Sequence, residues 1–138
     1  MNDRYLRSVV GMAALLQVIM ALYYLLRGHN DPGGGFIAGL IGGSAWILLI
    51  IADHISLARA WTLFQIFVFL GVFLALGSGG ASFFAGLPFL TGLWGPSLHF
   101  QPVGKVLASN ILTFDTGVFL TVMGFCGLFF LVSQEDKT

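Results

Sequence analysis

The stretch from Arg27 to Leu40 reads RGHNDPGGGFIAGL and lies between two long apolar runs, residues 8–26 and 36–52. Proline pre-sets φ for a turn, and glycine accepts the positive φ that many turns require. The chain therefore reverses here, and the two runs are predicted to form two antiparallel helices joined by a tight glycine-rich hairpin. The residues on which this hairpin depends are Pro32, Gly33, Gly34 and Gly35.

Outside this pair, two further apolar runs cover residues 61–77 and 111–132, and Gly77 begins a glycine-rich stretch that weakens the first of them. At ~1.5 Å per residue each of the four runs spans most or all of the ~30 Å of bilayer hydrocarbon. Residues 1–138 are thus predicted to form a single all-α domain with four transmembrane helices. The composition agrees, because only 9% of the residues are charged, against roughly 25% in soluble domains.

Composition also excludes several classes of protein. The net charge of zero gives no basic surface for nucleic acid, whose binding depends on neutralising phosphates. Cys126 is the only cysteine, and the three histidines do not lie at i, i+3 or i+4, so nothing predicts a metal or haem site. Three consecutive glycines without a following Gly-Lys-Ser/Thr do not make a phosphate-binding loop. We therefore expect no metal, no cofactor, no nucleic-acid partner and no enzymatic site, and we expect membrane lipid around the chain.

The orientation of the chain in the membrane is predicted from the basic residues near the ends of the four apolar runs. With four spans both chain ends lie on one side, and an excess of lysine and arginine on that side predicts cytoplasmic termini. Arg27 and Lys105 are the two basic residues of the other side. The four on the side of the chain ends are Arg4, Arg7, Arg59 and Lys137.

The third and fourth runs are joined by about thirty residues that are rich in aromatic side chains and carry Lys105 as their one full charge. Such an apolar segment is unsuited to bulk water. We expect a long aromatic loop that lies in the membrane interface or beneath another protein.

The second run begins with glycines four residues apart, Gly35, Gly39 and Gly43, which share one face of a helix. Small residues at this spacing let two transmembrane helices approach closely. We therefore interpret Gly39 and Gly43 as helix-packing residues. A file of ions or water along the same face is the alternative.

Asp115 is a carboxylate four residues inside the last apolar run, where a charge costs about 2.5–3.5 kcal/mol on insertion scales. The start of this run lies on the same side of the membrane as the glycine-rich hairpin, so Arg27 or His29 can reach Asp115. Two interpretations stay open: a carboxylate solvated at the interface and favoured by the helix N-terminus, or a role in an ion path or between subunits. Asp31, in the hairpin, is a further polar candidate and a possible cap of the second helix.

Helical phase divides the last run into two faces that do not suit lipid. The Asp115 face includes Phe119, Val122 and Cys126, and the opposite face carries the small residues Gly117, Thr121 and Gly124. In a bundle of four helices, the other three can hardly cover both faces of the helix predicted over residues 111–132. We therefore expect partner subunits to cover one face.

Two motifs then resemble a known family. The stretch RGHNDPGGGFIAGL at residues 27–40 resembles the signature of the MnhB/MrpB subunit of Mrp-type multisubunit sodium/proton antiporters. The stretch FDTGV at residues 114–118 is similar to the Phe-Asp-x-Gly-Val of that family at the start of the last helix. The likeness extends over the whole chain, including its size, the four spans and the aromatic loop.

The resemblance implies a subunit of a secondary transporter that uses the proton motive force to export sodium across the bacterial cell membrane. Its implied partners are the large antiporter-like subunits A and D and the small subunits C, E, F and G. The lysine and glutamate relay of the large subunits is absent here, because no lysine or glutamate lies within the four runs. One alternative is a membrane subunit of a hydrogenase related to complex I or of another redox-driven pump, and a second is an independent haem- or quinone-binding anchor.

Overall fold

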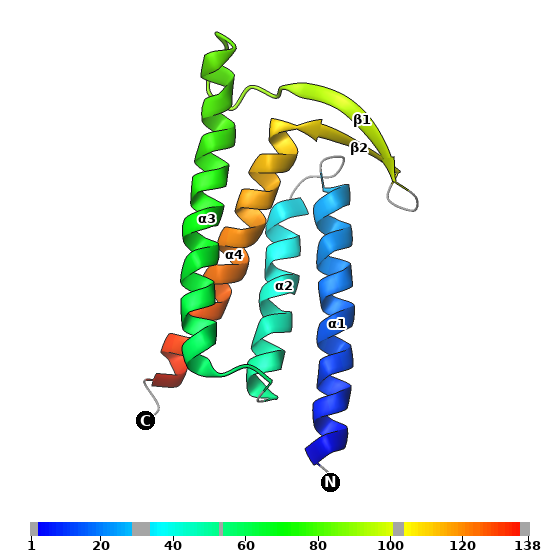
Figure 1. The fold of residues 1–138 in the computed structure, drawn as a ribbon, viewed down its shortest axis with the longest axis vertical. Helices are drawn as coiled ribbons and strands as arrows, with labels where there is room; N and C mark the ends of the chain where they lie inside the picture. The colour runs from blue at the N-terminus through cyan, green and yellow to red at the C-terminus, as the bar shows by residue number, and fades with distance from the viewer. Residues whose placement is uncertain (1–2, 29–33, 53, 101–103, 136–138) are drawn as a thin grey trace.

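The computed structural model describes residues 3–28, 34–52, 54–100 and 104–135. These residues form four α-helices and one β-hairpin (Figure 1). The helices are α1 (Asp3–Arg27), α2 (Gly34–Ile51), α3 (Leu57–Phe84) and α4 (Asn110–Glu135). The strands are β1 (Trp94–Phe100) and β2 (Gly104–Ser109), both in the connection between α3 and α4.

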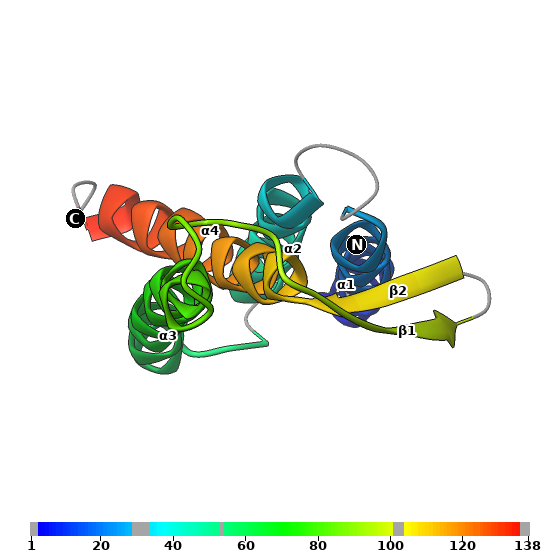
Figure 2. The same cartoon turned by 90° about the horizontal axis from the view of Figure 1, so that it is seen from above.

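The helices stand side by side in the order α3, α4, α2, α1, which differs from their order in the chain (Figures 1 and 2). The packed pairs are α3 with α4, α4 with α2, and α2 with α1. Consequently α2 and α4 run parallel and begin at the same end of the molecule, while α1 begins and α4 ends at the opposite end. This confirms four helices long and apolar enough to cross a membrane.

The helix α3 is longer than the run of residues 61–77 that predicted it. It has 28 residues, which correspond to ~42 Å, and it continues through the glycine-rich stretch that was expected to weaken it. It ends where Gly86 adopts a φ of 70° and the Leu87 N–H donates to the Ser82 carbonyl oxygen, the pattern of a Schellman motif. The turn at Gly86 therefore ends this helix, whereas the earlier glycines, Gly77, Gly79 and Gly80, lie within it.

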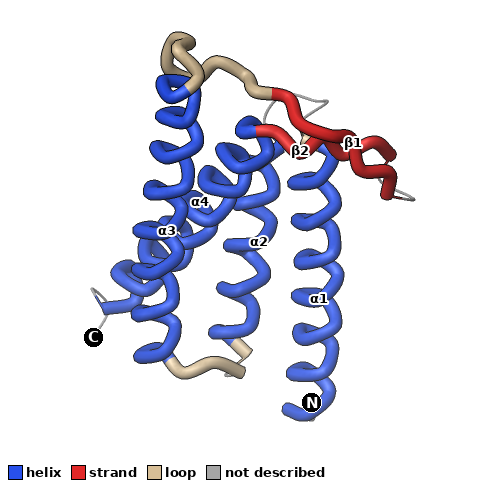
Figure 3. Tube along the Cα trace, turned by 45° about the horizontal axis from the view of Figure 1, so that its top comes forward, coloured by secondary structure: helices blue, strands red, loops and turns tan. Residues whose placement is uncertain are grey.

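The connection between α3 and α4 differs from the irregular loop that its composition suggested. β1 and β2 pair antiparallel, with Leu98 opposite Val106 and Phe100 opposite Gly104. Pairing satisfies backbone N–H and C=O groups of the two strands. The hairpin extends from the start of α4 over the end of the bundle towards α1 (Figures 2 and 3).

A small aromatic core lies at the end of the bundle nearest the chain termini. Phe64 of α3 is fully buried there beside Ile50 of α2 and Leu131 of α4. The Trp46 ring packs edge-on against Phe64, with 6.1 Å between the ring centroids. Three helices thus meet around one aromatic side chain, whereas many apolar side chains on their outer surfaces are exposed, as expected of a chain surrounded by lipid or by other subunits.

The contact between α3 and α4 depends on glycines in both helices. A Cβ at Gly117 would lie 2.6 Å from the backbone nitrogen of Ala75 and 2.7 Å from the carbonyl oxygen of Gly71. A Cβ at Gly124 would lie 2.7 Å from the carbonyl oxygen of Phe64. The two backbones therefore touch directly, which is the geometry that small residues permit in membrane helices.

Gly117→Ala is predicted to destabilise the chain by about 1–3 kcal/mol, because one methyl group must push two backbones apart. Gly77→Ala is the matched control: nothing lies within 4 Å of a Cβ there, and alanine favours the helix by up to about 1 kcal/mol over glycine. Thermal unfolding in detergent, followed by circular dichroism, measures both. Equal melting temperatures for the two variants would contradict this packing.

Candidate functional site

Asp115 lies in the second turn of α4, beside the first turn of α2. A Cβ at Gly35 would overlap the carbonyl oxygen of Asp115, so the first turn of α2 lies directly on the α4 backbone at this point. The Asp115 side chain is half-buried. The start of α2 and Asp115 therefore lie close together, at one end of the molecule.

The remaining glycines of α2 continue this contact down α4. A Cβ at Gly39 would lie 2.7 Å from the Val122 Cβ, and one at Gly43 would lie 2.9 Å from the Cys126 Cβ. The Asp115 face of α4 is thus the face that packs on α2. Side chains of α4 fill the space along the glycines, so these contacts favour helix packing over a file of ions or water.

The opposite face of α4, with Gly117, Thr121 and Gly124, packs on α3. The expectation that a partner subunit must cover one of these faces was wrong, because α4 is inserted between α2 and α3 and the chain covers both faces itself. Here α2 packs on one face of α4 and α3 on the other, and α2 and α3 also meet through the Trp46 and Phe64 rings at one end of the bundle.

Arg27 is the last residue of α1, near the start of α2. Its guanidinium donates a hydrogen bond to the Tyr23 hydroxyl and lies over the Tyr23 ring, 5.8 Å from the ring centroid. Gly28 and Gly34 approach so closely that a Cβ on either would overlap the other's Cα, which agrees with a tight reversal between α1 and α2. An ion pair between Arg27 and Asp115 stays a prediction.

Four residues that the sequence singled out lie outside the described residues. They are His29, Asp31, Pro32 and Gly33.

A polar cluster at the start of α4 was not predicted from the sequence. The Asn110 Oδ1 accepts a hydrogen bond of 2.8 Å from the Leu93 N–H, and its Nδ2 donates one of 2.8 Å to the Thr91 carbonyl oxygen. The hydroxyl of Ser82, a fully buried residue of α3, donates to the same Thr91 oxygen. One amide side chain thus connects α4 to the chain segment that follows α3.

Ser109 completes this end of α4. Its hydroxyl accepts a hydrogen bond of 3.3 Å from the Leu112 N–H, as the N-cap residue of a helix does. The sequence signal was present, since Ser109 and Asn110 come directly before the last apolar run. What it could not show is that Ser82 and Thr91 would come to lie beside them.

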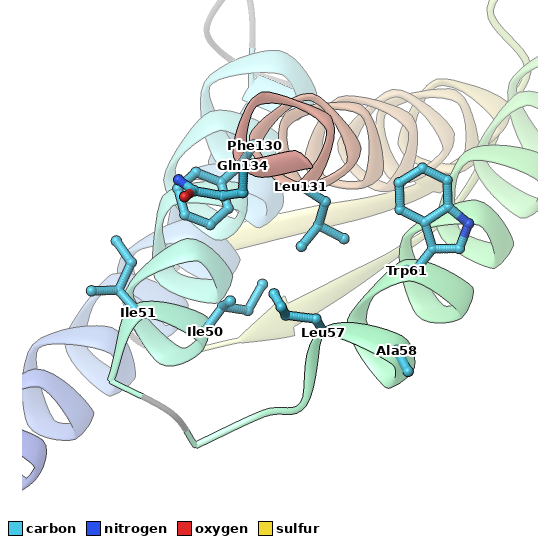
Figure 4. A pocket seen from close by; sticks show the side chains of 8 residues that line it. All are labelled: Ile50, Ile51, Leu57, Ala58, Trp61, Phe130, Leu131 and Gln134. Atoms are coloured by element: carbon cyan, nitrogen blue, oxygen red, sulfur yellow. The ribbon is translucent and has the colours of Figure 1, made fainter. Parts of the chain in front are cut away.

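Cavities lie near both ends of the bundle. One of about 240 Å³ lies beside the polar cluster, between Ser78, Asn110 and Phe114. A larger one of about 880 Å³ lies near the chain termini (Figure 4). Its lining side chains are Ile50, Ile51, Leu57, Ala58, Trp61, Phe130, Leu131 and Gln134.

The described residues contain no group of three or more His, Cys, Asp or Glu side chains that could hold a metal ion. What the site offers instead is Asp115, a half-buried acidic residue in an apolar helix at a helix–helix contact. The fold defines a multi-pass membrane protein with four transmembrane helices. Residues 5–128 match the family model described as "Domain related to MnhB subunit of Na+/H+ antiporter", and the chain belongs to this family.

Individual relatives agree with the family match. The chain is 37% identical over 128 residues to the B subunit of a Na(+)/H(+) antiporter of Bacillus subtilis (strain 168), covering 89% of this chain and 87% of the relative. It is 32% identical over 125 residues to a Staphylococcus epidermidis protein that carries the name antiporter subunit mnhB2. That match covers 89% of this chain and 88% of the relative. The relatives are bacterial, and the chain is a multi-pass protein of the cell membrane.

A solved structure has the same fold. It is the Mrp complex from Dietzia sp. DQ12-45-1b, one chain of which matches with a TM-score of 0.66 and 31% sequence identity. The match covers 91% of this chain but only 13% of that chain. The 138 residues therefore correspond to a small part of a much longer polypeptide in that complex.

Asn110→Ala is predicted to destabilise the chain by about 1–3 kcal/mol, because it leaves the Leu93 N–H and the Thr91 oxygen without their Asn110 partner. Thr113→Val, an exposed position in the same turn, serves as the control. The unfolding temperature in detergent reports the effect. A loss no larger than that of Thr113→Val would show that the Asn110 amide adds nothing to this connection.

Proposed function

We propose that this chain is a subunit of a multisubunit antiporter that exchanges sodium for protons, and that Asp115 is the residue through which it takes part in exchange. The chain is then a transporter component rather than an enzyme. Its partners are the large antiporter-like subunits A and D and the small subunits C, E, F and G. The observation that carries the proposal is the position of Asp115, inside an apolar helix and against the first turn of α2.

An ionised carboxylate at this position has a physical source of stabilisation. The N–H groups at the start of a helix lack helical acceptors and carry a partial positive charge. Asp115 lies beside the start of α2 and ~7.5 Å along the axis from the start of its own helix. The partial positive charge at the start of α2 therefore lies beside Asp115, and an ionised carboxylate is the form that attracts a cation or accepts a proton.

The chain needs other subunits to complete a path across the membrane. Asp115 is the one acidic residue that lies well inside the four apolar runs, and those runs hold no lysine or glutamate. One carboxylate near one end of α4 cannot relay ions across ~30 Å of hydrocarbon. We therefore expect the purified chain alone, in liposomes, to exchange no sodium for protons.

The proposal also includes an orientation. With the chain termini in the cytoplasm, the start of α4 and the β-hairpin lie towards the outer surface of the membrane. Asp115 then lies where sodium leaves and protons enter during export driven by the proton motive force.

Asp115→Asn is predicted to lower sodium-dependent proton exchange at least tenfold while leaving the complex assembled, since asparagine keeps the shape of the side chain and removes its charge. Exchange is measured by dye fluorescence in membrane vesicles that contain the whole complex, and assembly by co-purification of the subunits. Thr113→Val, two residues away and exposed, is the control and should exchange normally.

The other outcomes are equally informative. Loss of assembly in Asp115→Asn would assign the carboxylate to a contact between subunits and contradict a part in exchange. Normal assembly with normal exchange would leave only a carboxylate solvated at the interface. Failure of the unmodified chain to restore exchange to cells that lack its gene would contradict the proposed function as a whole.

A further inference from the structure

The outer surface of α1 is an exposed apolar helix face of the described chain. α1 stands at the end of the row and packs on α2 through one side (Figure 1). The residues of that side are small or well buried: Ala14 and Ala21 are each 1% exposed and Leu25 is 7% exposed. Most other apolar side chains of α1, such as Met12 at 67% and Leu16 at 62%, are exposed.

Gln17 lies near the middle of α1, at the edge of its contact with α2. The side chain is half-buried, and its amide oxygen Oε1 is buried without a hydrogen-bond partner. No other described side-chain oxygen or nitrogen is both buried and without a partner.

An amide without a partner is costly in the centre of a bilayer, because lipid tails offer neither donors nor acceptors. Gln17 is separated by more than two helical turns from both ends of α1, so water at the membrane surface does not reach it readily. Ala13, one turn before Gln17, is small and half-buried. A second helix can therefore approach the α1 backbone beside the amide.

We propose that Gln17 forms a hydrogen bond with a transmembrane helix of another subunit, packed along α1 beside its contact with α2. The inference rests on the proposed function, which places this chain in an assembly. When the side chain turns towards that helix, a hydroxyl or amide N–H of the helix donates to Oε1, the atom that lacks a partner in the chain alone. A lipid acyl chain in the same place offers Oε1 no donor.

Gln17→Leu separates this role from a structural one, because it replaces the amide with an apolar side chain of similar size. In the isolated chain in detergent, removal of an unpaired amide is expected to leave the melting temperature unchanged or to raise it. In the complex, purified through a tag on a different subunit, the fraction that retains this chain is expected to fall about threefold, which corresponds to ~0.6 kcal/mol. Met20→Leu, exposed on the same helix, is the control and should change neither quantity.

Retention equal to that of the unmodified complex would overturn the proposal. So would a lower melting temperature of the isolated Gln17→Leu chain, since the amide would then serve the chain's own fold. Failure of the unmodified chain to co-purify with any other subunit is a different result, because it contradicts the proposed assembly before Gln17 is tested.

Discussion

The close packing of α4 between α2 and α3 is the contact on which the rest of this structure depends. Glycines make it possible from both directions: Gly39 and Gly43 of α2 face one side of α4, and Gly71 of α3 meets Gly117 on the other. Lipid offers no hydrophobic force to drive helices together, so close van der Waals contact must supply much of the stability. Each interface uses backbone surfaces that a single methyl group would separate.

This packing also determines where the one strongly polar group of the spans can lie. Because α2 and α4 run parallel, the first turn of α2 comes to rest on α4 at Asp115. Asp115 is half-buried there, and its backbone contacts the first turn of α2. The β-hairpin and the Asn110 cluster hold the start of α4 at the same end. Stability and the proposed ion-exchange role thus share one set of contacts.

Much of the architecture was predictable from residues close together in the chain. Pro32 to Gly35 predicted the reversal between the first two helices, and the apolar runs predicted four spans, which the structure confirms. The helical phase of the last apolar run correctly placed Asp115 and Gly117 on different faces of α4. What sequence could not supply was the order of the helices in space, since nothing local to α4 says that α2 rather than a partner covers Asp115. The Asn110 cluster was not predicted for the same reason. Ser82 and Thr91 are distant from Asn110 in sequence, and only the fold brings them beside it.

A disulfide between α2 and α4, two helices that are not consecutive in the chain, tests the placement of α4 most directly. Gly43→Cys places a thiol next to the native Cys126, where the two Cβ atoms would lie 2.9 Å apart and need to separate by less than about 1 Å to reach the 3.5–4.5 Å of a disulfide. The measurement is maleimide labelling of the denatured chain after oxidation in the membrane. We predict that Gly43→Cys abolishes labelling of Cys126 without linking two chains, whereas Gly77→Cys leaves Cys126 fully labelled. Full labelling of Cys126 in oxidised Gly43→Cys, or linkage only between separate chains, would contradict the placement of α4 between α2 and α3.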